Sequence, residues 1–121
     1  MKKLTTVLIA AGLIASASAC SAQQQLTTAE TCDRVGVAAA GIPQSPSQTA
    51  TIRAANAIRP IEPVASTEMK PVVTAILEFL DEQGKDEPTD AAQKSEREAK
   101  LAELNASFQE AGAKYGELCR G

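Results

Sequence analysis

Three cysteines are the side chains of this 121-residue sequence with the widest choice of chemistry, and they stand apart at Cys20, Cys32 and Cys119. A thiolate can act as a nucleophile, bind a metal or pair with another thiol. The chain has no C-x-x-C spacing and no histidine, which removes the commonest general base and metal ligand. G-x-S-x-G, Walker, H-E-x-x-H and S-x-x-K patterns are also missing. We therefore expect no enzyme, no cofactor and no bound metal.

The first 19 residues have the three-part organisation of an export signal. Lys2 and Lys3 precede an apolar core, residues 7–15, and a tail of small residues, 16–19. Even the longer apolar stretch 4–19 has only sixteen residues, whereas a membrane-spanning helix needs roughly 20. We therefore expect a cleaved signal peptide over residues 1–19 and no retained transmembrane anchor.

The end of this signal resembles the precursors of bacterial lipoproteins. The likeness rests on Ser18, Ala19 and Cys20, and it implies that Cys20 receives a diacylglyceryl thioether and becomes the new N-terminus. Ala17 departs from the pattern, because the family most often has leucine there. Residues 17–19 also satisfy the A-x-A rule of ordinary signal peptidase, so cleavage without lipid stays open. The resemblance implies a protein exported and lipid-anchored to the bacterial cell membrane, or to the outer membrane of a Gram-negative cell.

The number of cysteines bears on whether Cys20 carries lipid and on whether the other two cysteines form a disulfide. Exported proteins generally pair their thiols in an oxidising compartment. If Cys20 carries lipid, Cys32 and Cys119 remain as one pair, whereas an unmodified Cys20 leaves one thiol over. We therefore predict lipidation at Cys20 and a disulfide between Cys32 and Cys119. Two buried free thiols are the alternative for the latter pair.

The charge and aromatic content limit the partners. Removal of residues 1–19 leaves 102 residues with 10 basic and 15 acidic side chains, a net charge of about −5. This balance argues against nucleic acid and against electrostatic docking on anionic lipids. Phe79, Phe108 and Tyr115 are the only aromatic residues, too few for a base-stacking surface. We expect a membrane contact through the lipid anchor, an envelope protein of unknown identity as partner, and no nucleic acid.

Glycine and proline divide residues 27–121 into four helical segments. The first covers 27–40 and opens with capping-box spacing. The second covers 45–59 and also opens with such a box, with Pro46 at its first helical position. The third covers 67–83, with proline at its fourth position. The fourth covers 90–118, which gives a helix of about 43 Å. Nothing shows the period-two alternation of a strand.

Each segment has residues that we expect to face a common core. In the fourth segment they recur at spacings of 3 and 4, as in a heptad seam. Its pairs Glu96/Lys100 and Glu110/Lys114 have favourable i,i+4 order. The expected inward residues are Cys32, Val35 and Ala39; Ile52, Ala55, Ile58 and Arg59, which form a weak stripe; Val72, Val73, Ile76, Leu77, Phe79 and Leu80; Leu101, Leu104, Phe108, Ala111, Tyr115 and Leu118.

These segments predict the fold class. Four helices joined by short loops normally alternate in direction. We therefore predict an all-α, up-down-up-down bundle with a long C-terminal helix, closed by one disulfide. In that topology the first helix begins where the fourth ends, so Cys32 and Cys119 lie at the same end. The bridge would close a loop of 88 residues, which corresponds to roughly 4–5 kcal/mol of chain entropy.

Two other features have a functional and a structural interpretation. The acidic turn at residues 81–90 has enough carboxylates for a weak calcium site, but its spacing is not that of an EF-hand, and a solvated loop is favoured. Tyr115 could bind haem iron as a phenolate, but its place on the seam favours core packing.

The sequence thus predicts a non-catalytic helical binding or structural module, tethered to the membrane of a bacterial envelope. Residues 20–26 are the lipidated cysteine and a short tether, which holds the domain, residues 27–121, within about 20 Å of the membrane. The alternative is a carrier or sensor of a small apolar ligand held between the helices. Self-association through the C-terminal helix is a third possibility.

Overall fold

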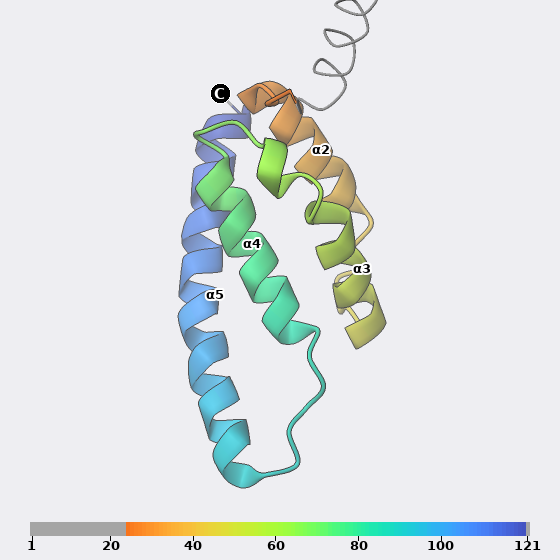
Figure 1. Ribbon diagram of the computed structural model, residues 1–121, viewed down its shortest axis with the longest axis vertical. Coiled ribbons are helices and arrows are strands. Elements are labelled where there is room, and N and C mark those ends of the chain that lie inside the picture. The colour runs from red at the N-terminus through yellow and green to blue at the C-terminus, as the bar shows by residue number, and fades with distance from the viewer. Residues whose placement is uncertain (1–23, 121) are drawn as a thin grey trace, which may run out of the picture.

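A computed structural model describes residues 24–120, so the predicted signal peptide and Cys20 lie outside the described residues. The described chain forms four α-helices: α2 (Thr28–Ala40), α3 (Gln48–Ile58), α4 (Lys70–Gln83) and α5 (Ala91–Arg120). A short 3₁₀-helix, η1 (Glu62–Val64), links α3 to α4. Consecutive helices run in opposite directions, and α5 extends well beyond the others (Figure 1). The predicted up-down-up-down bundle with a long C-terminal helix is confirmed.

The start of α2 has the predicted capping box. The Thr27 hydroxyl accepts the Glu30 N–H at 3.2 Å, and the Glu30 carboxylate accepts the Thr27 N–H at 2.8 Å. The bond from the Thr27 N–H to the charged carboxylate is the main cause of the lowered pKa of Glu30. Further along α2, Val35 is buried as expected but Ala39 is exposed. The inward face of α2 is turned toward Ala38, which packs against the core in place of Ala39.

The second helix begins later than the sequence predicts. Ser47, and not Ser45, is the N-cap of α3, because its hydroxyl accepts the Ala50 N–H at 3.2 Å. Pro46 therefore lies before the helix and not at its first position. Ala55 and Ile58 are buried as expected. Arg59, at the C-cap of α3, is exposed because its guanidinium pairs with Asp81, and Ile52 is 43% exposed. Its expected place on the inward face is taken by Thr51 and Ala54.

The third helix also begins later, at Lys70, which makes Pro71 its second residue. Ser66 precedes the turn that leads into α4. Its hydroxyl accepts the Met69 N–H at 3.3 Å and its carbonyl accepts the Lys70 N–H at 2.9 Å. Residues 67–69 form this turn instead of the first helical turn. A proline in the first turn removes no intrahelical hydrogen bond, so the physical reason for its tolerance is unchanged.

The core lies between α4 and the other three helices. Ile58, Met69 and Val73 have at most 1% of their surface exposed. On α5, all six predicted seam residues are buried or half-buried, and Phe108 stacks on Phe79 of α4 with ring centroids 4.6 Å apart. The predicted heptad seam is therefore confirmed.

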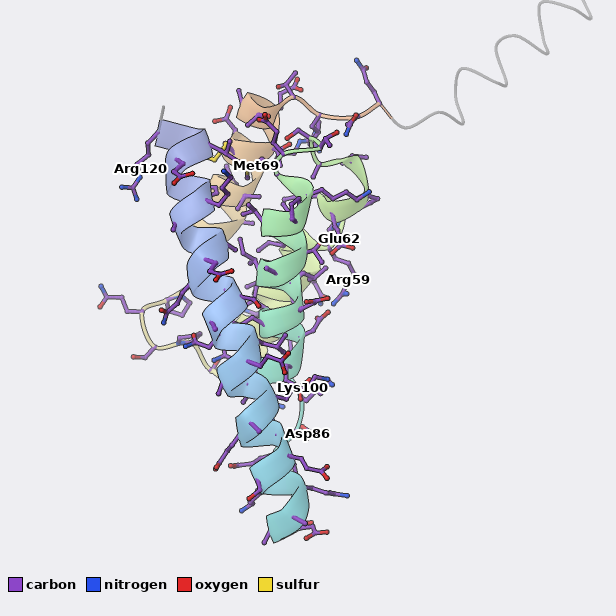
Figure 2. The ribbon with its side chains drawn as sticks, turned by 90° about the vertical axis from the view of Figure 1, so that its left-hand side faces the viewer. Arg59, Glu62, Met69, Asp86, Lys100 and Arg120 are labelled. Atoms are coloured by element: carbon purple, nitrogen blue, oxygen red, sulfur yellow. A yellow bond between two sulfur atoms is a disulfide. The ribbon has the colours of Figure 1, made fainter. Side chains whose placement is uncertain are left out.

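The predicted disulfide joins the beginning of α2 to the end of α5. Cys32 and Cys119 are bonded, with their Cα atoms 5.6 Å apart. The bridge lies at the end of the bundle near Met69 and Arg120 (Figure 2). Tyr115 packs against the same core and donates its hydroxyl to the Cys32 carbonyl at 3.3 Å. Gly36 leaves room for this ring, because a Cβ there would lie 3.3 Å from the Tyr115 hydroxyl oxygen.

The chain before α2 is held against the turn before α4. The Leu26 N–H donates to the Val64 carbonyl at 2.7 Å, and the Gln25 amide donates to the Ala65 carbonyl at 3.1 Å. Residues 25 and 26, the end of the expected tether, are thus bonded to the domain. Deeper inside, the fully buried Thr31 hydroxyl accepts the Ser66 N–H at 3.1 Å.

Candidate functional site

The acidic turn is not a free cluster of solvated charges. Asp81 forms an ion pair with Arg59 at 2.6 Å, and the buried Glu82 pairs with Lys85 at 2.7 Å and Lys100 at 3.4 Å. The hydrogen bond from Lys85 is the main cause of the lowered pKa of Glu82. Among residues 24–120, no group of three side chains of the ligating types could hold a metal ion. Asp81 and Glu82 thus belong to the last turn of α4 and attach it to Arg59 and Lys100 of the neighbouring elements, whereas Asp86, Glu87 and Asp90 are exposed.

The ion pairs expected along α5 are replaced by others. Lys100 contacts Glu82 of α4 instead of Glu96, because its long side chain reaches a carboxylate that the bundle buries. Lys114 contacts Glu117 at 3.3 Å instead of Glu110.

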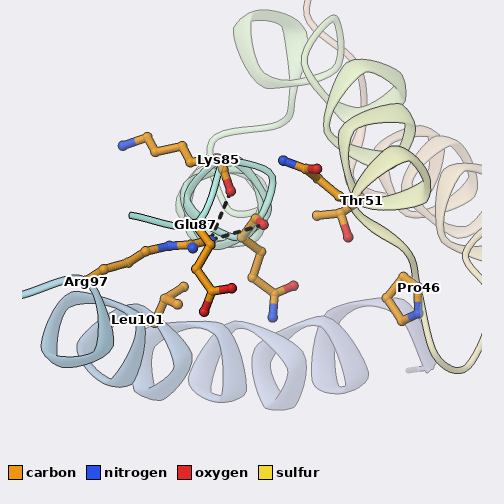
Figure 3. A pocket seen from close by; sticks show the side chains of 8 residues that line it. Pro46, Thr51, Lys85, Glu87, Arg97 and Leu101 are labelled. Carbon is orange, nitrogen blue, oxygen red and sulfur yellow. Dashed lines mark hydrogen bonds between the residues drawn. The ribbon is translucent and has the colours of Figure 1, made fainter. Parts of the chain in front are cut away.

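Arg97 closes the end of α4, a role that the sequence did not predict. Its guanidinium donates to the carbonyl oxygens of Glu82, Gln83 and Lys85 at 3.3, 3.5 and 3.1 Å. Carbonyls at a helix end have no intrahelical partner, so these bonds satisfy groups that the fold leaves open. Figure 3 shows Arg97 reaching across to α4 beside a hollow of about 530 Å³. Nη2 makes all three of these bonds, and Nε is buried without a hydrogen-bond partner among the described residues, so Arg97 caps the end of α4 through one nitrogen.

The second place with distinctive surface chemistry is a groove between α2 and α3. Two adjoining hollows of about 420 and 490 Å³ are lined by seven and nine residues, three of them shared. We call this surface the α2–α3 groove. It is mainly apolar, and its lining residues are Asp33, Arg34, Val37, Ala38, Gly41, Ile42, Pro43, Ala50, Arg53, Ala54, Ala57, Pro60 and Ile61.

Val37 is the main apolar contact point that this groove offers to solvent. It lines both hollows, and 78% of its surface is exposed, more than that of Ile52, the other exposed large apolar residue of the described chain. Val35, two positions earlier, is 3% exposed. Residues two apart on a helix point to opposite sides, so Val35 fills the core and Val37 faces outward. The sequence did not predict this surface. Its one sign in the sequence is Val37, an apolar residue that does not lie on the inward-facing side of α2.

Charges of both signs border the groove. Asp33 and Arg34 lie at one hollow and Arg53 at the other. None of the three takes part in the ion pairs found in residues 24–120. Arg34 is close enough to Glu30 of the same helix for its charge to contribute to the lowered pKa of that carboxyl. Charged side chains beside an exposed apolar strip are typical of the border of an interaction surface.

The predicted site residues fall into two groups. Cys32 and Cys119 are brought together as a disulfide, whereas the predicted lipidation site Cys20 lies outside the described residues. No helix in residues 24–120 combines the length and apolarity required to cross a bilayer. Comparisons with protein-family models, curated proteins and solved structures found no match for this chain.

Proposed function

We propose that this chain is a non-catalytic binding module, tethered by lipid to a bacterial envelope membrane, which docks a protein partner in the α2–α3 groove. The observation that carries the proposal is the position of Val37, exposed between two apolar hollows. Exposing an apolar side chain to water costs free energy that a partner recovers by covering it.

A protein partner has more support than a small ligand enclosed between the helices. Ile58, Met69 and Val73 fill the centre of the bundle and are at most 1% exposed. The α2–α3 groove is open to solvent along its length. Ligand pockets usually bury most of the ligand surface, whereas an open groove suits the side chains of another protein.

The proposed tether is short. Because Gln25 and Leu26 are bonded to the domain, only residues 21–24 separate it from Cys20, a reach of at most about 14 Å. The start of α2 and the disulfide would therefore lie beside the membrane.

Replacing the proposed acylation site tests this tether. We expect Cys20→Ser to move the protein from the membrane fraction to the soluble fraction, because two or more acyl chains hold a protein far more firmly than one. Fractionation before and after a carbonate wash measures the effect. Retention of Cys20→Ser on washed membranes would contradict lipid anchoring but not groove docking.

A photo-reactive residue at position 37 tests the groove. Placed in the full-length protein in its native membrane, it should form an adduct of defined mass with a protein. The matched control is the same residue at position 106, which is exposed on α5. We expect adducts from position 37 and none from position 106. An adduct with a small apolar molecule would favour the carrier, and no adduct at position 37 would refute docking there.

A further inference from the structure

The α2–α3 groove is complementary to itself, and we propose that its occupant is a second copy of this chain. This inference rests on the proposed function of the groove as a docking surface. A twofold interface brings the same patch of both copies together, so one patch must offer both a projection and a recess. Val37 projects, with 78% of its surface exposed, beside recesses lined by the small side chains of Ala38 and Ala57.

The charges at the border of the α2–α3 groove are also complementary to those of a second copy. Asp33 and Arg34 are neighbours in sequence, one turn before Val37, and neither forms an ion pair in the described chain. A twofold axis running along the helices brings residues of equal height together. Each Asp33 then faces the Arg34 of the other copy, twice in one interface. The groove thus has both charges of the pair, which a partner of uniformly acidic or basic surface would not match.

The short tether favours a dimer in which the helices of the two copies run in the same direction. Thr28 precedes Val37 by nine residues, about 13.5 Å along α2. Antiparallel copies meeting at Val37 would therefore hold their first helical residues about 27 Å apart along the helix axis. When the helices stand normal to the membrane, a tether that reaches about 14 Å would not anchor the copy whose first helical residue lies about 27 Å farther from the membrane. Parallel copies with the axis normal to the membrane place both anchors on the same side.

The size of the groove sets the strength of the contact. Its 13 lining residues are fewer than the roughly 20–30 that each partner contributes to a stable interface. We therefore expect a weak dimer that forms on the membrane, where tethering raises the effective concentration of each copy.

Cysteine cross-linking in the native membrane tests the proposal. In the full-length protein, Val37→Cys should form a covalent dimer on mild oxidation, because two residues at the axis bring their Cα atoms within about 7 Å. The matched control is Ala106→Cys, an exposed position on α5. We expect the Val37→Cys dimer to form at least about tenfold faster on a non-reducing gel. Mass spectrometry of the monomer checks that Cys32 and Cys119 remain paired.

Charge reversal separates a built interface from chance encounters. In the Val37→Cys protein, Asp33→Arg should slow cross-linking a few-fold, because like charges then face each other. Adding Arg34→Asp to the same chain should restore the rate. Equal rates at positions 37 and 106, faster cross-linking at 106, or no rescue by the double reversal would each overturn the proposal. A position-37 photo-adduct with a different protein, without self-cross-linking, would retain groove docking but exclude the second copy.

Discussion

The two ends of the bundle are held together by different physical means. At one end a disulfide joins α2 to α5, and the buried Thr31 hydroxyl accepts the Ser66 N–H. At the other end, charged side chains make the connections: Arg97 caps α4, and Glu82 pairs with two lysines that are more than half exposed. The first end should hold over a wide range of pH and salt, whereas the second should depend on both.

Removal of the disulfide should lower the stability of the domain more than any change at the charged end. We expect Cys32→Ser/Cys119→Ser to lower the thermal midpoint by well over 10 °C, because the bridge spans 87 residues and is worth roughly 4–5 kcal/mol in the chain-entropy account. A domain of this size loses roughly 4–8 °C per kcal/mol. Calorimetry of the two proteins measures it. A midpoint within 5 °C of the native value would mean that the covalent end is not the stronger one.

Loss of the buried Thr31 hydroxyl should cause the second largest loss of stability. Thr31→Val keeps the shape but leaves the Ser66 N–H without its acceptor, at a cost of about 1–3 kcal/mol. Thr31→Ser retains the hydroxyl and should recover most of the loss. Thr49→Val, at an exposed position of α3, is the control and should change stability by less than about 0.5 kcal/mol. Equal stabilities of the Thr31→Val and Thr49→Val proteins in urea titrations would count against this account.

Glu82 should make the second end sensitive to acid. Its pKa is lowered in the folded protein, mainly by the Lys85 hydrogen bond, so its contribution is present above the unfolded pKa. That contribution is lost as the pH falls through the folded pKa. Glu82→Gln should therefore be less stable than the native protein at pH 7, by about 0.2–1 kcal/mol, since the lysines are exposed. The difference should vanish near pH 2.

Thermal midpoints of both proteins across this pH range provide the measurement. Glu103→Gln, an exposed carboxylate on α5, is the matched control. A difference between Glu82→Gln and the native protein that persisted undiminished at the acid limit would show that Glu82 acts through packing and not through charge.

The smallest effect should come from the loop itself. We expect Asp86→Asn/Glu87→Gln/Asp90→Asn to change stability by less than about 0.5 kcal/mol. The new side chains keep acceptor oxygens for the bonds that Gln48 makes to Asp86 and that the Ala92 N–H makes to Asp90. Thermal unfolding with and without calcium checks this expectation. Stabilisation of the native protein alone by calcium would show a metal site in the loop.

The sequence was sufficient for features that repeat or come in pairs. The seam of α5 extends over six residues, so its period determines which side of the helix is buried. Cys32 and Cys119 could be paired because the predicted export and lipidation leave these two thiols for each other, and the alternating topology then places them together.

Features that depend on a single residue's neighbours were not predictable in the same way. The start of α3 moved because Ser47, among several serines and threonines, accepts the Ala50 N–H. The start of α4 moved because residues 67–69 form a separate turn, in which the Ser66 hydroxyl accepts the Met69 N–H. Glu82 looks like part of an acidic loop until α5 brings Lys100 beside it. The α2–α3 groove is formed by two helices together, so neither helix alone reveals it.

The contact between Gly36 and Tyr115 should couple the two positions during evolution. The two residues are far apart in sequence, but a Cβ at residue 36 would lie 3.3 Å from the Tyr115 hydroxyl oxygen, which would then have to shift by a few tenths of an ångström. A substitution at either position affects the other: a side chain at 36 fits more easily beside a residue that lacks the hydroxyl, such as phenylalanine at 115, which also gives up the hydrogen bond to the Cys32 carbonyl. In descendants of a common ancestor the two positions should therefore vary together, and a change at one without the other should be rare.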